Sequence, residues 1–178
     1  MEKINYEGEL YYIANGKVFD EHFLEVSLDI SKKIMSEYYM HIDYKSLNEE
    51  EFISFLSEVK ISEQYNFCID CIIYGLGKFS NSKNYYGLVF PMLTSCYRAM
   101  GKSQQAIEFF KTNNNLLLSV ASVALYTSLA AAYCDVGDYA KAREFANRAY
   151  AMQGGGTNHK NELSLVFMRI KKESNDNY

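Results

Sequence analysis

The 178-residue chain lacks the usual features of membrane, secreted and nucleic-acid-binding proteins. No apolar run approaches the roughly 20 residues that a helix needs to cross a bilayer. The opening residues are neither basic nor hydrophobic enough for a signal peptide, so we expect a cytoplasmic protein that binds no membrane. A formal net charge of −4 disfavours nucleic acid as the ligand, because phosphate binding requires a concentrated basic surface. Tryptophan is also absent, and that absence excludes nothing.

Cysteine and histidine are scarce, with four and three residues respectively. Because no secretory signal accompanies them, we expect the cysteines to be reduced core residues rather than disulfides. Cys68 and Cys71 have the spacing of half a zinc site or of a redox pair, but no second pair of ligands stands at a matching separation, and core packing is the better interpretation. The chain also shows no combined nucleophile, base and orienting group. It therefore predicts no catalytic residue, no metal, no cofactor and no enzyme activity.

What the chain does contain is a helical hairpin near its C-terminal end. Apolar and small residues recur at helical spacing over 123–135, and Gly137 follows where a helix would stop. Asp138 can then accept hydrogen bonds from the free amides of a second helix, over about 139–151. Ala142, Ala146 and Ala149 form one stripe of that helix, small enough for two helix axes to approach closely.

A second copy of this hairpin lies directly upstream, 36 residues earlier when counted from Tyr97 to Tyr133. The residues in equivalent positions are Leu93, Tyr97, Gly101 and Ala106 in the upstream copy, and Leu129, Tyr133, Gly137 and Ala142 in the downstream copy. Pro91 is the only proline of the chain. Because proline is tolerated in the first turn of a helix, it predicts a helix start near 88–90.

A single further helix is predicted downstream, over about 161–173. Leu163 and Phe167 repeat Leu129 and Tyr133 after 34 residues. Its apolar side would cover the open end of the helical stack. Its basic residues, Arg169, Lys171 and Lys172, are read as solvated side chains that favour a helix C-terminus.

The hairpin residues also indicate a family. Tyr126, Leu129, Ala130, Tyr133, Gly137, Tyr139, Ala142 and Ala149 stand at the spacings of the W-x2-L-G-x2-Y…A signature, and the segment 87–173 resembles tetratricopeptide repeats. The resemblance implies an all-α or mainly α fold of antiparallel helical hairpins stacked as a short superhelix. Because the usual period of the family is about 34 residues, the surplus of two falls in the polar stretch 112–115. The expected single domain, 1–178, divides into a possible β-hairpin (1–19), diverged helices (20–86), two repeats (87–122 and 123–156) and a capping helix (157–173).

The resemblance implies a binding groove on the concave surface, formed by the first helix of each hairpin. The groove-facing residues would be those between the packing positions: Pro91, Ser95, Arg98, Ala99, Thr127, Ala131, Cys134 and Asp135. Arg98 has two open interpretations, a partner for a ligand carboxylate or a solvated or internally paired side chain. Family members that hold the C-terminal carboxylate of heat-shock chaperones use lysines and asparagines in the groove, which Thr127 and Ala131 do not supply.

Three functions follow as expectations. The first is an adaptor that binds a peptide or protein segment in the groove, with no nucleic acid or membrane as partner and with a homo-oligomer left open. The second is a dedicated bacterial chaperone or a peptide-responsive regulator of the same repeat type. The third is an accessory subunit of an enzyme or metal protein that uses the N-terminal half.

That N-terminal half predicts three helices and a hairpin. One helix is capped by Asp20 or the next residue, one follows a capping box at 46–49, and one opens at Ser62. Their expected apolar faces are Phe23, Val26, Ile30, Ile34 and Tyr38; Phe52, Phe55, Leu56 and Val59; and Tyr65, Ile69, Ile72, Ile73 and Leu76. The third, apolar on most sides, is expected to be buried. An Asn-Gly pair at 15–16 between β-favouring runs predicts a β-hairpin, and the competing interpretation is a helix that stops at Gly16.

Overall fold

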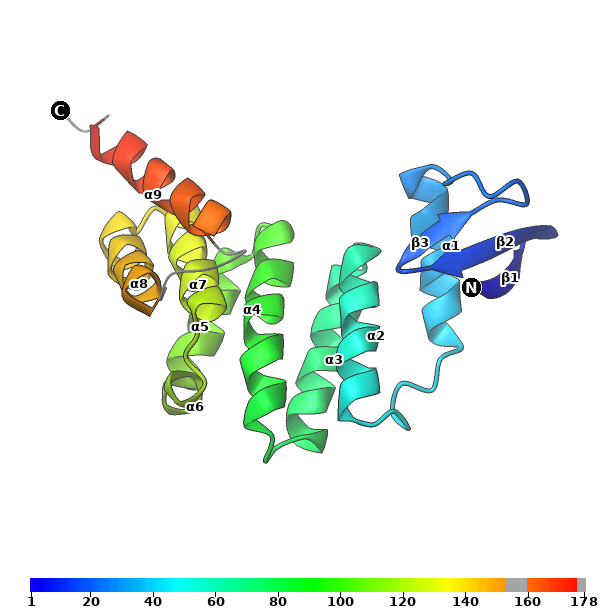
Figure 1. Cartoon of the computed structure of the whole chain (residues 1–178), viewed down its shortest axis with the longest axis horizontal. Coiled ribbons are helices and arrows are strands. Elements are labelled where there is room, and N and C mark those ends of the chain that lie inside the picture. The colour runs from blue at the N-terminus through cyan, green and yellow to red at the C-terminus, as the bar shows by residue number, and fades with distance from the viewer. Residues whose placement is uncertain (153–159, 176–178) are drawn as a thin grey trace. The chain divides into compact units, whose positions relative to one another are not determined.

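The computed structural model describes residues 1–152 and 160–175 and groups the chain into two compact units. We call Met1–Lys78 the N-terminal unit and Phe79–Tyr178 the C-terminal unit, and describe each by itself (Figure 1). The predicted fold class is confirmed, since the chain is mainly helical and carries a small sheet near its N-terminus. Residues 154–156 are three glycines at the end of the second predicted repeat, where the sequence predicts a connection, and they lie outside the described residues. The single domain stays a prediction.

The N-terminal unit begins with a three-stranded antiparallel sheet, β1 (Glu2–Tyr6), β2 (Glu9–Ala14) and β3 (Lys17–Phe19), in the order β1-β2-β3. Asn15 and Gly16 both have positive φ, at 52° and 72°, and join β2 to β3. Two such residues give a turn whose twist matches that of the strands, so the predicted hairpin is confirmed and the competing helix is wrong. Strand β1 was not predicted.

Helix α1 (Leu28–Met40) starts later than the sequence predicts. The Asp20 side chain caps a loop instead, because its Oδ1 accepts hydrogen bonds from the backbone N–H groups of His22 and Leu24. Such local bonds compete with helix formation. They hold Phe23 at a φ of 60° with 57% of the residue exposed, so the predicted apolar face is wrong at that position. Ile30 is exposed as well, Val26 and Tyr38 are half-buried, and the buried residues of α1 are Ile34, Met35 and Tyr39.

Helix α2 (Glu49–Ile61) buries the four residues predicted for it, Phe52, Phe55, Leu56 and Val59. Its capping box, however, lies two residues later than predicted, at 48–51 instead of 46–49. The Asn48 side chain accepts from the Glu51 N–H, and the Glu51 carboxylate accepts from the Asn48 N–H, both at 3.0 Å. Ser46 is committed elsewhere, since its hydroxyl donates to the Asp43 carbonyl at 2.8 Å.

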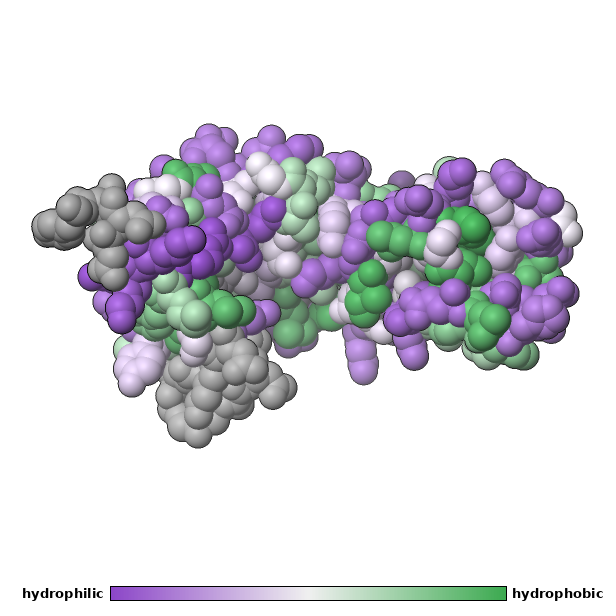
Figure 2. Space-filling view, turned by 90° about the horizontal axis from the view of Figure 1, so that it is seen from above, coloured by the Kyte–Doolittle hydropathy of each residue, from purple (hydrophilic) through white to green (hydrophobic). Residues whose placement is uncertain are grey.

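Helix α3 (Tyr65–Lys78) begins three residues after Ser62, which caps the C-terminal end of α2 rather than opening a helix. The interpretation of the cysteine pair as core residues agrees with the structure. Cys68 and Cys71 are both buried, and burial raises the pKa of the Cys71 thiol to about 12. Ile73 is 48% exposed, so the expectation that α3 is buried on most sides is wrong there. Figure 2 shows further apolar side chains in patches on the N-terminal unit.

The C-terminal unit contains α4 (Lys83–Ala99), α5 (Ser103–Thr112), α6 (Asn114–Ser119), α7 (Val123–Asp135), α8 (Tyr139–Met152) and α9 (Lys160–Asn175). Helix α7 packs against α4, α5, α8 and α9, and α8 also packs against α9. The helices predicted over 123–135, 139–151 and 161–173 are therefore confirmed. Helix α6 was not predicted and follows α5 within the stretch 112–115, where a connection was expected.

The α4–α5 and α7–α8 hairpins turn in the same way. Gly101 and Gly137 have φ of 69° and 78°, a conformation that a Cβ atom disfavours. In both turns the glycine N–H donates three residues back, and the next residue donates five residues back. This pattern ends a helix by satisfying its last carbonyls. The two copies found in the sequence thus share a local structure as well as a spacing.

The predicted start of the upstream helix is wrong, because α4 begins at Lys83 and carries Pro91 in its interior. The Ser82 hydroxyl caps this helix by accepting from the Tyr85 N–H at 3.0 Å. A proline inside a helix removes one hydrogen bond and crowds the carbonyl four residues earlier. That residue is Gly87, at which an added Cβ atom would come no closer than 4.0 Å to its nearest neighbour, Val120.

Candidate binding groove of the C-terminal unit

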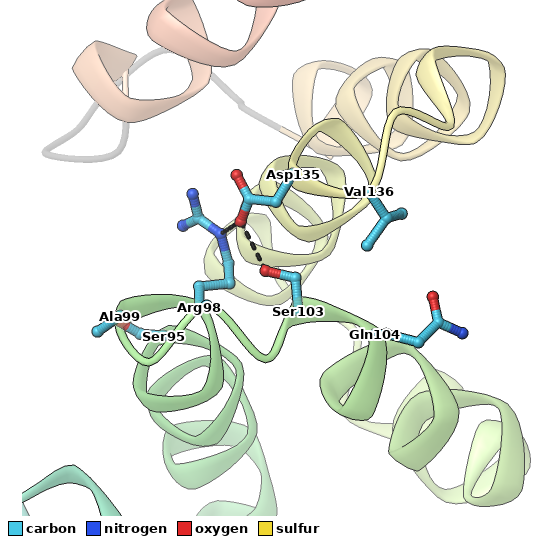
Figure 3. Close-up of a pocket in the computed structure, with 8 residues that line it drawn as sticks. Ser95, Arg98, Ala99, Ser103, Gln104, Asp135 and Val136 are labelled. Atoms are coloured by element: carbon cyan, nitrogen blue, oxygen red, sulfur yellow. Dashed lines mark hydrogen bonds and ion pairs between the residues drawn. The ribbon is translucent and has the colours of Figure 1, made fainter.

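The groove-facing residues predicted from the sequence line two adjoining pockets of the C-terminal unit. The first pocket, of about 460 Å³, is lined by Ser95, Arg98, Ala99 and Asp135 from the predicted set, together with Gly101, Ser103, Gln104 and Val136 (Figure 3). The second pocket, of about 250 Å³, is lined by Ser95, Arg98, Thr127 and Ala131 from that set, together with Ser128, Glu162, Leu165, Val166 and Arg169. Ser95 and Arg98 belong to both, so we call the two pockets together the groove. Pro91 and Cys134 line neither pocket.

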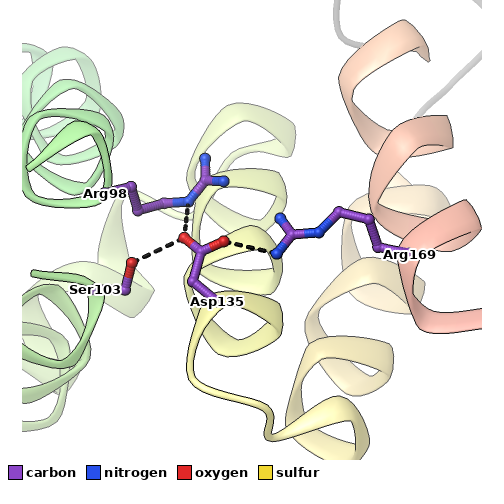
Figure 4. A network of polar contacts seen from close by, with 4 residues as sticks. All are labelled: Arg98, Ser103, Asp135 and Arg169. Atoms are coloured by element: carbon purple, nitrogen blue, oxygen red, sulfur yellow. Dashed lines mark hydrogen bonds and ion pairs between the residues drawn. The ribbon is translucent and has the colours of Figure 1, made fainter. Parts of the chain in front are cut away.

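Asp135, at the C-terminal end of α7, is the centre of the groove's polar contacts (Figure 4). Its Oδ2 accepts from Arg98 Nε at 2.7 Å and from the Ser103 hydroxyl at 2.8 Å, and its Oδ1 accepts from Arg169 Nη2 at 2.7 Å. These partners lie on α4, α5 and α9. The Nε of Arg98 is therefore paired within the protein. Of the two interpretations of Arg98, a partner for a ligand carboxylate or an internally paired side chain, the second holds for this atom.

The electrostatics of Asp135 follow from its position. Burial raises the pKa of its carboxyl, but the hydrogen bonds from Arg98, Arg169 and Ser103 outweigh that effect and hold the pKa below its ordinary value. With its side chain only 25% exposed, the carboxylate is ionised at neutral pH and bonded by three donors. It thus acts as a fixed anion that positions two guanidinium groups.

Asp135 accepts only one hydrogen bond from each of the two arginines, Arg98 and Arg169. A guanidinium has five N–H donors, and each arginine gives one to Asp135. The remaining donors have no partner within residues 1–152 and 160–175. Since the side chains of Arg98 and Arg169 are 28% and 42% exposed, these donors are accessible from the groove.

Arg169 was missed as a groove residue, and its reading as a solvated side chain is wrong. A signal was present, because Arg169 follows Asp135 by the same 34 residues that separate Leu129 from Leu163. The buried side of α9 was predicted better, since Leu163, Val166 and Ile170 are buried and Phe167 is half-buried. The same helix exposes Leu165 and Met168, at 58% and 66%.

Thr127 adds a polar group that its surroundings leave unsatisfied. The residue lines the second pocket and is 2% exposed, and its hydroxyl has no hydrogen-bond partner among the described residues. A buried hydroxyl without a partner costs about 1–3 kcal/mol. The hydroxyl oxygen is itself buried, so a group bound in the pocket would reach it only if the side chain rotated.

Other kinds of site are not seen in the described part of the chain. Within it, no three His, Cys, Asp or Glu side chains gather as they would around a metal ion. None of its helices has both the length and the apolar character that crossing a membrane requires. Comparison with protein-family models, with curated proteins and with solved structures found no match to the chain.

Proposed function

We propose that the C-terminal unit is an interaction module that binds a segment of another protein in the groove, in the manner of a tetratricopeptide repeat. The observation that carries the proposal is the Arg98–Asp135–Arg169 contact, because it brings side chains of three helices to one surface. Two partly exposed guanidinium groups and several hydroxyls then face two connected pockets.

The groove has the composition expected of a peptide-binding surface. Leu165 is 58% exposed in the wall of the second pocket, and Val136 is 40% exposed in the wall of the first. Apolar side chains of this kind provide contacts for the side chains of a bound segment, while a few polar groups fix its orientation. An extended segment could contact both pockets by passing over Arg98, which they share.

The groove is also held in place before any partner binds. Asp135 connects α4, α5 and α9 to α7 through charge-assisted hydrogen bonds of 2.7 to 2.8 Å. A preformed site loses less conformational entropy when it binds a ligand. The network therefore contributes to affinity through the shape of the groove as well as through direct contacts.

The proposal includes a protein partner and a cytoplasmic location. The formal net charge of −4 makes nucleic acid a poor ligand, because binding a phosphate backbone requires an extended basic surface. Burial of all four cysteines as free thiols is compatible with a reducing compartment.

Site-specific photo-cross-linking in the native host tests the proposal. The full chain would carry p-benzoylphenylalanine at Leu165 in the groove or, as a matched control, at Lys171 on the same helix. We expect one or a few defined protein adducts from position 165 and none of these from position 171. Arg98→Glu should abolish those adducts. Equal adducts from both positions, or adducts that survive Arg98→Glu, would refute binding in the groove.

A further inference from the structure

The second pocket is lined by several hydrogen-bond donors and by one carboxylate, that of Glu162. Arg98 and Arg169 face it with N–H groups left over from their contact with Asp135. Ser95, Thr127 and Ser128 add hydroxyls. Asp135 itself already accepts three hydrogen bonds, so it is a poor partner for a positively charged ligand. The unused guanidinium donors favour a ligand that supplies acceptor oxygens.

The pocket also has the size of a side chain. At about 250 Å³ it lies below the range of roughly 300–1,000 Å³ typical of sites for whole cofactors or drug-sized molecules. Its donors come from α4, α7 and α9, which surround the space from three directions. A tetrahedral group with three free oxygens can meet donors from three directions, whereas a planar carboxylate presents two oxygens in one plane.

Thr127 is the donor on α7 that the present arrangement leaves unpaired. In a helix, threonine has two accessible χ1 rotamers, and rotation between them moves the hydroxyl to another position around Cβ. The hydroxyl is buried now, so a ligand oxygen would be met after that rotation. Binding would then satisfy a group that is unsatisfied in the unbound protein.

Net charge alone does not select the ligand. Arg98, Arg169 and Asp135 together carry one positive charge, and exposed Glu162 reduces the attraction for every anion alike. Selection must therefore come from geometry and from the number of acceptor oxygens. Ser95 and Arg98 line both pockets, so the chain on which such a group is carried would extend toward the first pocket.

We propose that the second pocket binds the phosphate group of a phosphorylated serine or threonine in a partner segment, bridged by Arg98 and Arg169 and bonded by Thr127. This inference rests on the proposed function, since it names the recognition element of the segment in the groove. No covalent step is involved, and the phosphate is bound as an intact monoester.

Peptide binding by the purified full chain tests the inference. Three degenerate peptide libraries would carry a fixed central phosphoserine or phosphothreonine, the unmodified residue, or aspartate. Selected peptides would then be titrated by calorimetry. We expect the phosphorylated form to bind about tenfold or more tightly than either counterpart, and Arg169→Gln to remove about tenfold of that affinity. Lys171→Gln, which removes the same charge elsewhere on α9, should leave binding unchanged.

The outcomes separate this inference from the proposed function. Thr127→Val should weaken phosphopeptides several-fold and leave any binding of the unmodified peptides unchanged. Equal affinity for all three libraries, with loss on Arg98→Glu, would overturn phosphate recognition and keep a peptide-binding groove. Inorganic phosphate that binds as tightly as the phosphopeptides would overturn recognition of a protein segment. Absence of binding to every library would overturn the phosphopeptide inference, while the cross-linking result would still decide the proposed function.

Discussion

Asp135 and Arg169 are 34 residues apart in the sequence, and an ion pair of 2.7 Å joins Oδ1 of one to Nη2 of the other. They stand at equivalent positions of α7 and α9, as judged by the spacing of Leu129 and Leu163. Arg98 reaches the same carboxylate from α4. The charged centre of the groove thus arises from α4, α7 and α9, each of which contributes one side chain.

Replacement of Asp135 by asparagine should destabilise the C-terminal unit. The variant keeps the shape of the side chain but leaves Arg98 and Arg169 without their anion, and we expect a loss of about 1–2 kcal/mol in the free energy of unfolding. Urea titration followed by circular dichroism measures it. Lys141→Gln is the control, because it breaks an exposed ion pair with Glu144 and should cost less than about 0.5 kcal/mol. Equal effects of the two substitutions would contradict a central role for Asp135.

The contribution of Asp135 should also depend on pH in a defined direction. Its pKa is lower in the folded chain than the ordinary value of about 3.9. The ionised carboxylate therefore stabilises the fold fully above about pH 3.9, and this contribution is lost as the pH falls from there through the folded pKa. The stability difference between wild type and Asp135→Asn should be constant near neutral pH and shrink in acid. A difference that stays the same in acid would show that the carboxylate charge contributes nothing.

Gly16 and Gly8 offer a matched test of the N-terminal sheet. Both have positive φ, at 72° and 89°, so alanine is strained at either position. A Cβ atom at Gly16 would lie 2.9 Å from the backbone oxygen of Glu58, whereas one at Gly8 would meet nothing within 4 Å. We expect Gly16→Ala to cost about 1–3 kcal/mol more than Gly8→Ala in chemical unfolding. Similar costs would mean that the β2–β3 turn does not pack closely on α2.

Substitutions at Asn48 and Ser46 test which of the two residues caps α2. Asn48 is the observed cap, and Ser46 is the cap that the sequence suggests. Asn48→Ala removes the acceptor of the Glu51 N–H and should destabilise the N-terminal unit by about 1 kcal/mol. Ser46→Ala removes a single hydroxyl contact to the Asp43 carbonyl in an exposed turn and should have a smaller effect. Thermal unfolding of both variants measures the difference, and the reverse order would support a cap at Ser46.

Local patterns account for the successful predictions from the sequence. The helices at 123–135 and 139–151 follow from apolar spacing, and the turns at Gly101 and Gly137 follow from the freedom of glycine to adopt positive φ. The β-hairpin at Asn15 and Gly16 has the same origin. These features depend on neighbours in the chain, so residue order is sufficient to indicate them.

The errors arose where one local preference competed with another. Pro91 predicts a helix start, but Ser82 caps α4, which begins at Lys83 and continues through the proline. The side chain of Asp20 can cap either a helix or a loop. In the structure it caps a loop, because it accepts hydrogen bonds from the N–H groups of His22 and Leu24. In each case the sequence contains both possibilities, and packing and backbone geometry choose between them.

The candidate groove shows the same division. Helical periodicity, the 36-residue repeat and the surface of each first helix can be read from residue order, because they depend on spacing along one chain segment. The pairing of Arg98 and Arg169 with Asp135, and the unpaired hydroxyl of buried Thr127, depend on how α4, α7 and α9 pack together. Tertiary structure decides these contacts because hydrogen bonds and ion pairs act over a few ångströms, and only packing brings groups 34 or 37 residues apart within that distance.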